Sequence, residues 1–252
     1  MGHEWRGTDQ TIAYGAAKAV NSVLAELVAR CKKGEDISPR VRVGLFGYSE
    51  PNQIKKVDWA SDNTTPESDG LLSIPEVYKV TEEVYDPEEE TYVPWVVTEE
   101  ASGGTPMQHA LQEVLSVAEN FAQTHSDSFP PIIINITDGE PTDMDHDDIP
   151  NEVHPLTSVA TADGNALMCN VHLSKVQAPQ AFLPSSENGL PDEFSKSLFR
   201  ASSEVPDGMA NVGRTKDALD IPEGARLFAY NADPTALLQL LTLASSAPVG
   251  KE

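Results

Sequence analysis

The stretch of sequence that decides the fold is Pro131-Ile132-Ile133-Ile134-Asn135-Ile136-Thr137. Because side chains of an extended chain alternate between two faces, this run of isoleucines places apolar groups on both faces. Strands with two apolar faces are typical of parallel sheets that helices cover on both sides. The stretches 166–172 and 225–230 repeat the pattern. The sequence therefore predicts a parallel sheet buried between helices.

Amphipathic segments separate the predicted strands. Apolar residues recur at intervals of three and four from residue 11 to 31 and from 106 to about 124, which is the spacing of one buried helix face. Further helical segments are expected around residues 153–162, 192–203 and 233–243. Alternating strands and helices predict an α/β fold with a doubly wound, mostly parallel sheet flanked by helices. We expect a single domain over residues 1–252.

The segment between the two long helices is expected to hold a strand and an insertion. Residues 41–48 read as a buried strand, and its two glycines indicate close approach of a neighbouring element. Residues 49–100 combine acidic runs with two short β-prone pieces, 77–80 and 92–97. This composition predicts an acidic hairpin inserted into the domain at about residues 49–100.

Charge and cysteine content limit the classes of partner. The chain has 17 basic and 40 acidic side chains, for a net charge of -23. Such a surface repels phosphate backbones and anionic lipid, so we expect no nucleic-acid partner and no membrane partner. Without a leader or a run of ~18 apolar residues, the protein is predicted to be cytoplasmic. Cys31 and Cys169 lie in apolar patterns and are expected to be buried, reduced thiols.

Two loops carry the functional signal. One is Gly103-Gly104-Thr105-Pro106, which opens a helix, and the other is residues 137–143, Thr-Asp-Gly-Glu-Pro-Thr-Asp, which follows a strand. A hard divalent cation binds hydroxyl and carboxylate oxygens, which both loops offer through Thr105 and Asp138. Each loop also has a simpler reading. Thr105 with Gln108 fits a helix capping box, and Asp138-Gly139 fits a tight turn.

The pairing of these loops resembles two of the three loops of the metal-ion-dependent adhesion site in the von Willebrand factor type A domain. The resemblance extends over nearly the whole chain, with 11–31 similar to the first family helix and 41–48 to its second strand. It implies a non-enzymatic, protein-binding module. By the same resemblance, Thr105 and Asp138 would bind Mg²⁺ or Mn²⁺.

The resemblance also implies the kind of partner. An open coordination position on the ion would take an acidic side chain of another protein, and Gly103, Gly104, Glu140 and Pro141 would form the partner-facing rim. A basic patch on the partner is the other expected contact. The form of the motifs is similar to the intracellular bacterial branch, whose members often accompany phosphatases, kinases or tellurium-resistance proteins.

One element of the family pattern is missing. The first loop, Asp-x-Ser-x-Ser, and the central strand before it have no counterpart in the sequence. Two metal ligands of five would remain, so the ion would bind weakly. We hypothesise that Met1 corresponds to the methionine after that loop and that the chain starts one strand late. The alternatives are a degenerate domain that binds partners without metal, or a strand donated by another chain.

A rival reading is a metal-dependent hydrolase or phosphatase. Six acids follow the isoleucine strand: Asp138, Glu140, Asp143, Asp145, Asp147 and Asp148. Carboxylates in such numbers can hold two metal ions that activate water. A solvated loop before the next helix would have the same composition. His172, on an apolar strand, is expected to be a core histidine.

Overall fold

The computed structural model describes residues 11–49, 54–56, 71–82, 85–86, 91–92, 103–173 and 179–246. Within these ranges the chain is mixed α/β, with a four-stranded sheet in the order β13-β14-β12-β9. Strands β9 (Ile132–Thr137), β12 (Leu167–His172) and β14 (Phe228–Tyr230) run parallel. The short β13 (Ala181–Phe182) is antiparallel to β14. The prediction of an α/β fold with a mostly parallel sheet is confirmed.

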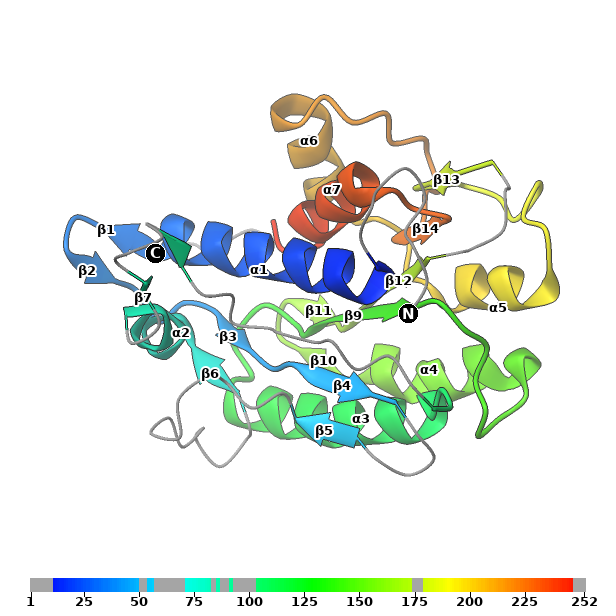
Figure 1. Cartoon of the computed structure of the whole chain (residues 1–252), viewed down its shortest axis with the longest axis horizontal. Coiled ribbons are helices and arrows are strands. Elements are labelled where there is room, and N and C mark those ends of the chain that lie inside the picture. The colour runs from blue at the N-terminus through cyan, green and yellow to red at the C-terminus, as the bar shows by residue number, and fades with distance from the viewer. Residues whose placement is uncertain are drawn as a thin grey trace.

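Helices cover both faces of the sheet, as Figure 1 shows. One hydrophobic cluster joins one face to α1 (Ile12–Cys31), α6 (Asp207–Lys216) and α7 (Pro234–Ala244). A second cluster joins the other face to α3 (Met107–Thr124), α4 (Ile149–Ser158) and α5 (Glu193–Ala201). Strand alternation separates the clusters, because Ile134 and Val171 pack in the first while Ile133 and Met168 pack in the second. The core is therefore two apolar layers with the sheet between them.

Most predicted helices are confirmed. α1 and α3 occupy the two long amphipathic segments, and α5 and α7 match 192–203 and 233–243. Three of them begin after a capping side chain: Thr11, Asp192 and Asp233 each accept a backbone N–H of the first turn. These caps are local in sequence, which is why the pattern located the helix starts well.

Two helical predictions need correction. The segment 153–162 is shifted: α4 ends at Ser158, and residues 160–161 form β10 (Ala160–Thr161), paired with β11 (Gly164–Asn165). Helix α4 begins at Ile149, four residues before the predicted start. It has a proline in its first turn and directly follows the short 3-10 helix η1 (His146–Asp148). Helix α6 was not predicted, because its two glycines weaken the helical pattern and its burial rests on Met209, Ala210 and Gly213.

The predicted strand at 41–48 is wrong as a single buried element. It divides into β3 (Arg42–Val43), paired with β6 (Leu72–Ser73), and β4 (Phe46–Tyr48), paired with β5 (Ile54–Lys56). Neither β3 nor β4 is buried. The expected close approach does occur, because a β-carbon on Gly44 would lie 2.7 Å from the Leu71 side chain.

The insertion at about 49–100 is only partly a hairpin. β7 (Tyr85–Asp86) pairs with β8 (Thr91–Tyr92), but the β-prone piece 77–80 lies inside helix α2 (Ile74–Glu82). The Ser73 N–H donates to the Glu76 carboxylate over 2.7 Å, which is one of the two hydrogen bonds of a capping box. The β-prone residues that follow suggested a strand instead of a helix. Residues 93–97 lie outside the described residues. After α1, a separate small hairpin joins β1 (Lys32–Lys33) to β2 (Asp36–Ile37), with Gly34 at a φ of 69°.

The isoleucine strand is less buried than its sequence predicts. Ile132, Ile133, Ile134 and Ile136 are each half-buried, whereas β12 is buried along five of its six residues. The physical reason is position, because β9 ends the four-stranded sheet and no strand among the described residues pairs with its outer edge. A sequence typical of a central strand thus occupies an edge.

Both cysteines are buried free thiols, as predicted. Among the described helices, α1 is long and apolar enough to cross a membrane by length and composition alone. Half of its most apolar stretch is buried inside the protein. Core helices meet the same criterion, so this feature assigns no membrane role.

Candidate functional site

The structure brings the two loops of the sequence analysis together. The Thr105 N–H donates to the Thr142 hydroxyl over 3.0 Å, and the Thr142 N–H donates to the Thr105 carbonyl over 2.9 Å. A β-carbon on Gly139 would lie 3.1 Å from the Thr105 hydroxyl oxygen. Residues 103–106 and 137–143 therefore form one surface, although more than thirty residues separate them in the chain.

Glycine permits this close contact. A β-carbon on Gly104 would lie 2.7 Å from the Thr142 hydroxyl, which is closer than real side chains come. Gly103 has a φ of 98°, in the region that glycine adopts without strain. The two glycines before Thr105 thus set how near the loop comes to residue 142.

Thr105 does not cap α3, so the capping-box prediction is wrong. Pro106 occupies the cap position, where no side chain bonds the helix. The carboxylate of Asp143 instead accepts the N–H of Gln108 over 3.1 Å and the N–H of His109 over 3.0 Å. The His109 ring lies 3.2 Å from the same carboxylate. Because a distant carboxylate satisfies the helix end, the Thr105 hydroxyl is not used there.

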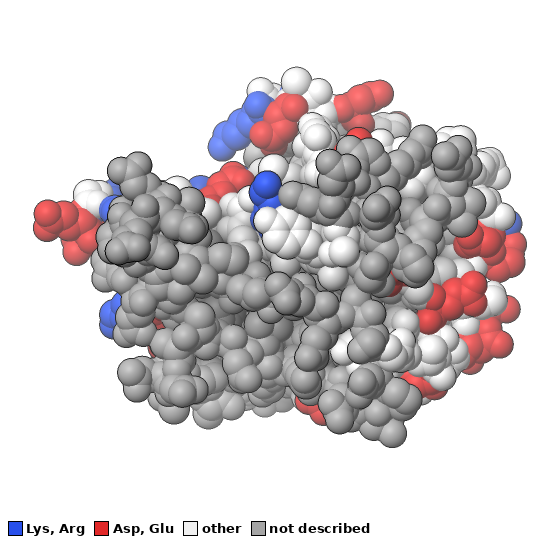
Figure 2. Space-filling view, in the orientation of Figure 1, with Lys and Arg blue, Asp and Glu red and all other residues white. Residues whose placement is uncertain are grey.

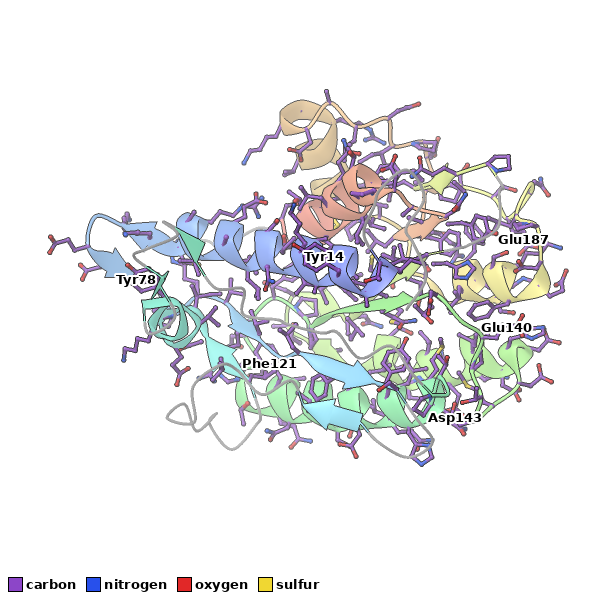
Figure 3. All side chains as sticks on the ribbon, in the orientation of Figure 1. Tyr14, Tyr78, Phe121, Glu140, Asp143 and Glu187 are labelled. Carbon is purple, nitrogen blue, oxygen red and sulfur yellow. The ribbon has the colours of Figure 1, made fainter. Side chains whose placement is uncertain are left out.

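Figure 3 shows Asp143 beside the beginning of α3, with Glu140 earlier in the same loop. Burial alone would raise the pKa of the Asp143 carboxyl. The hydrogen bonds from His109 and Gln108 outweigh burial, and the pKa lies below its ordinary value. This carboxylate therefore stays charged and serves as a structural link between the loop and the helix.

We expect Asp143→Ala to lower the free energy of unfolding by about 1–2 kcal/mol, because two helix N–H groups lose their acceptor. The folded pKa is depressed, so this stabilisation is present above the ordinary pKa of about 3.8 and is lost as pH falls further. Urea unfolding at pH 7 and at pH 3 measures both effects. Asp145→Ala is the matched control, since the Asp145 carboxylate is exposed, accepts the Asp147 N–H and lies 3.8 Å from the His146 ring, with no contact to α3 among its described bonds. A difference between wild type and Asp143→Ala that is equal at both pH values would contradict this role.

Asp138 lies where the sequence placed it, directly after β9. The Thr137 hydroxyl donates to the Gly139 carbonyl over 2.9 Å, so the chain turns tightly around Asp138. One carboxylate oxygen of Asp138 is shielded from solvent. The negative charge of Asp138 acts on His172 and on Tyr48, which places it near the ends of β12 and β4. The carboxylate thus stands at the carboxyl edge of the sheet, where ligands of such folds gather.

His172 is the neighbour of Thr137 across the sheet. Its ring packs against Phe194 and Tyr230, and among the described residues its Nδ1 has no hydrogen-bond partner. Burial lowers the pKa of His172 to about 4, although the charges of Asp192 and Asp138 act in the opposite direction. The prediction of a core histidine is right about burial, and the ring is neutral at physiological pH.

The four residues expected to form the rim belong to the same two loops as Thr105 and Asp138. Gly103 is exposed, Gly104 and Pro141 are half-buried, and the Glu140 side chain is 65% exposed. Figure 2 shows acidic side chains gathered on the flank where Figure 1 places α4 and α5. A partner approaching the rim therefore meets a negative surface.

The six acids of the hydrolase reading do not form one cluster. Among the described residues, one group could hold an ion through its side chains: Asp145, His146 and Asp147, whose ligand atoms lie within 4.8 Å of one another. Asp145 and Asp147 are exposed, with side chains 68% and 72% accessible. Asp143 is engaged at α3, as described above. The arrangement is that of a solvated acidic loop with a histidine inside it.

A hollow of about 240 Å³ lies away from both loops, between α4 and the end of α5. It is lined by His154, Arg200 and Arg226, among others. Arg200 makes a bidentate pair with Glu187, with nitrogen–oxygen distances of 2.7 and 2.9 Å, and Arg226 donates to the Ser202 carbonyl. The arginines hold the helix end in place, so the hollow has a structural explanation.

No structural role was predicted for three residues of the site, Thr142, Asp143 and Tyr48, and Asp143 was expected only as one of six acids that could hold metal ions. The first two join the loops, and the Tyr48 hydroxyl donates to the Asn135 side chain over 2.6 Å. The only sequence signal was that Thr142 and Asp143 stand in the same loop as Asp138. Their partners, Thr105 before α3 and Gln108 and His109 within it, are 34 to 37 residues away, so no local pattern shows the contacts.

No model of a protein family matches the sequence, and neither a curated protein nor a solved structure is found to be similar to the chain.

Proposed function

We propose that this chain is a protein-binding module of von Willebrand factor A type, with a doubly wound sheet. In this proposal Thr105 and Asp138 hold Mg²⁺ or Mn²⁺, and a partner protein places an acidic side chain on the ion. Gly103, Gly104, Glu140 and Pro141 form the rim that selects the partner. The proposed location is the cytoplasm, with a phosphatase- or kinase-associated protein as the class of partner and with neither nucleic acid nor a membrane.

One observation carries the proposal: the Thr105 hydroxyl lies against Gly139, the residue that follows Asp138. Two loops distant in sequence thus present a hydroxyl and a carboxylate at the carboxyl edge of one sheet. These are the hard oxygen donors that Mg²⁺ and Mn²⁺ prefer, and Mg²⁺ commonly keeps several waters beside few protein ligands. The donor set fits such an ion in kind, and its small number predicts weak affinity.

The charge of the protein gives the ion a physical role. A partner carboxylate would be repelled by a chain of net charge -23 and by the exposed Glu140 at the rim. A bound divalent cation supplies the positive charge and the open coordination position that such a carboxylate needs. Thr105 and Asp138 would hold the cation, the glycines would leave room for the partner, and Glu140 would favour cation capture.

We expect calorimetric titration with Mn²⁺ to detect one weak site in wild type, and Asp138→Ala and Thr105→Val each to weaken it about tenfold or more, because each removes one of two protein ligands. Mn²⁺ is paramagnetic, so it should also broaden the amide NMR signals of Gly139 and Thr105 first. Asp145→Ala is the matched control and should change the affinity by less than about twofold. Binding that is lost in Asp145→Ala but kept in Asp138→Ala would refute the assignment.

A metal-dependent hydrolase is the second candidate function, and the grouping of Asp145, His146 and Asp147 favours it. Turnover of p-nitrophenyl phosphate with Mg²⁺ or Mn²⁺, abolished by Asp145→Ala, would establish it in place of the module. Absence of metal binding in the titration, with partner binding retained, would instead indicate a metal-free interaction domain.

A further inference from the structure

The outer edge of β9 offers a row of backbone groups for pairing. The Leu167 N–H bonds the Pro131 carbonyl and the Leu173 N–H bonds the Thr137 carbonyl, so the odd-numbered residues of β9 point to β12. In a parallel ladder the alternate residues point their N–H and C=O groups the opposite way. Ile132, Ile134 and Ile136 therefore direct theirs outward, where no described strand receives them.

The surroundings of this edge are those of a sheet interior. One face of β9 packs in the cluster that contains α1 and α7, and the other face packs in the cluster that contains α3 and α4. On the far side of the edge, Val43 and Leu45 pack against the first cluster and Tyr48 against the second. The segment from β3 to β4 thus continues the same layer. Its backbone pairs with β6 and β5, and among the described residues the Tyr48 side chain is the group that bonds to β9.

The helices on both faces of this edge and the acidic loop after β9 define which segment could bind there. An added strand would have helices on both faces, so it must be apolar on both faces, and six residues match the length of β9. Strands β9, β12 and β14 all run parallel, and a strand in the same direction would end beside the acidic loop that follows β9. Glu140, Asp145 and Asp147 are exposed there, which favours lysine or arginine at the end of the added strand.

A second copy of this chain fits the edge poorly. Its own β9 lies between its own helices, and each copy brings a net charge of -23. We propose that the outer edge of β9 binds one extended apolar segment of a partner protein, about six residues long, that runs parallel to β9 and carries basic residues at its carboxyl end. This inference uses neither Thr105 nor a metal ion, so it stands independently of the proposed function.

Amide hydrogen exchange by NMR tests the edge, with a fluorescein-labelled peptide of this chain's residues 131–137 followed by two lysines as probe. Without peptide, the amides of Ile132, Ile134 and Ile136 should exchange much faster than those of Ile133, Asn135 and Thr137. The peptide should protect the first set. A control peptide ending in two glutamates should bind about tenfold more weakly at low salt, and 0.5 M salt should narrow the difference.

Proline substitutions separate the two edges of β9. Ile134→Pro removes an outward N–H and should fold, while its affinity for the lysine peptide should fall about tenfold below that of Ile134→Ala, which loses the side chain but keeps the N–H. Ile133→Pro removes a bond to β12 and should lose folding. Equal peptide binding by Ile134→Pro and Ile134→Ala overturns the proposal. So do outer amides that are slow in the free protein, or protection that rises with protein concentration and thereby shows self-association.

Discussion

Replacement of Asn170 by alanine is expected to lower the free energy of unfolding by about 3 kcal/mol, which would be among the largest effects of a single polar substitution in this protein. Asn170 is completely buried in the middle of β12. Its Oδ1 accepts the Asn135 side-chain N–H over 3.0 Å, and its Nδ2 donates to the Ser202 hydroxyl over 3.1 Å and to the Leu198 carbonyl over 3.2 Å. The substitution leaves a buried donor on Asn135 without an acceptor and opens a cavity.

Asn170 has a large expected effect because it belongs to a chain of side-chain hydrogen bonds. From Tyr48 through Asn135 and Asn170 to Ser202, side-chain hydrogen bonds connect β4, β9, β12 and the end of α5. Burial raises the pKa of the Tyr48 phenol, so the hydroxyl remains protonated and donates to Asn135. Within an apolar core, a network of polar side chains that are all hydrogen-bonded favours one alignment of these strands and this helix over others.

Urea unfolding measures the effect, with an unchanged slope against urea as the sign of an intact two-state transition. Asn165→Ala is the matched control, because Asn165 is exposed and donates one hydrogen bond to the Thr157 carbonyl. It should change the free energy by less than about 1 kcal/mol. Tyr48→Phe removes only the terminal bond and should have an effect of about 1 kcal/mol. A loss below about 1 kcal/mol in Asn170→Ala would contradict a stabilising network.

The second large effect is a loss of stability between pH 6.5 and pH 4, on the order of 3 kcal/mol from His172 alone. The folded pKa of His172 is lowered from 6.5 to about 4 by burial. In this window the unfolded chain takes up a proton that the folded protein does not, so stability falls as pH falls. Above pH 6.5 the residue is neutral in both states and contributes no slope. Below pH 4, further losses come from carboxylates such as Asp143.

His172→Leu should abolish this slope, since leucine has a similar volume and does not titrate. At pH 7 the variant should be within about 1 kcal/mol of wild type, because the buried Nδ1 has no hydrogen bond to lose among the described residues. His154→Leu is the control at an exposed histidine and should keep the wild-type slope. Thermal unfolding at half-unit pH steps from 7 to 4 records the curves. If His172→Leu and wild type lose stability in parallel, the buried ring is not the titrating group.

Local pattern predicted the fold as far as each signal was local. The periodicity of 11–31 repeats with every helical turn, and the caps Asp192 and Asp233 lie within one turn of the helix starts that they fix. Helices α1, α5 and α7 are therefore where the pattern predicted them. The prediction was wrong at 77–80. The β-branched residues there suggested a strand, whereas Ser73, Glu76 and the contacts of Val77 in the core produce a helix.

The two loops of the candidate site could be picked out from the sequence, but their arrangement could not. The sequence named Thr105 and Asp138 from the chemistry of their loops. It assigned the helix end to Thr105, whereas Asp143 caps α3 from across the fold. A carboxylate that bonds a helix 34 residues away produces no local sequence pattern in either segment, because the two come into contact only when the sheet and helices pack.

Sequence alone determined that this chain has a strand like Ile132–Thr137, with apolar side chains on both faces, and that helices must cover it, because water disfavours exposed isoleucine at any position in the fold. Tertiary structure alone decided that this strand ends the sheet formed by the described residues and that the backbone groups of its even-numbered residues point away from β12. It also decided that the loops 103–106 and 137–143 meet. Hydrophobicity acts on each residue without direction, so the sequence carries it directly. Hydrogen bonds have direction and need both partners in place, so strand order and loop contacts exist only once the chain has packed.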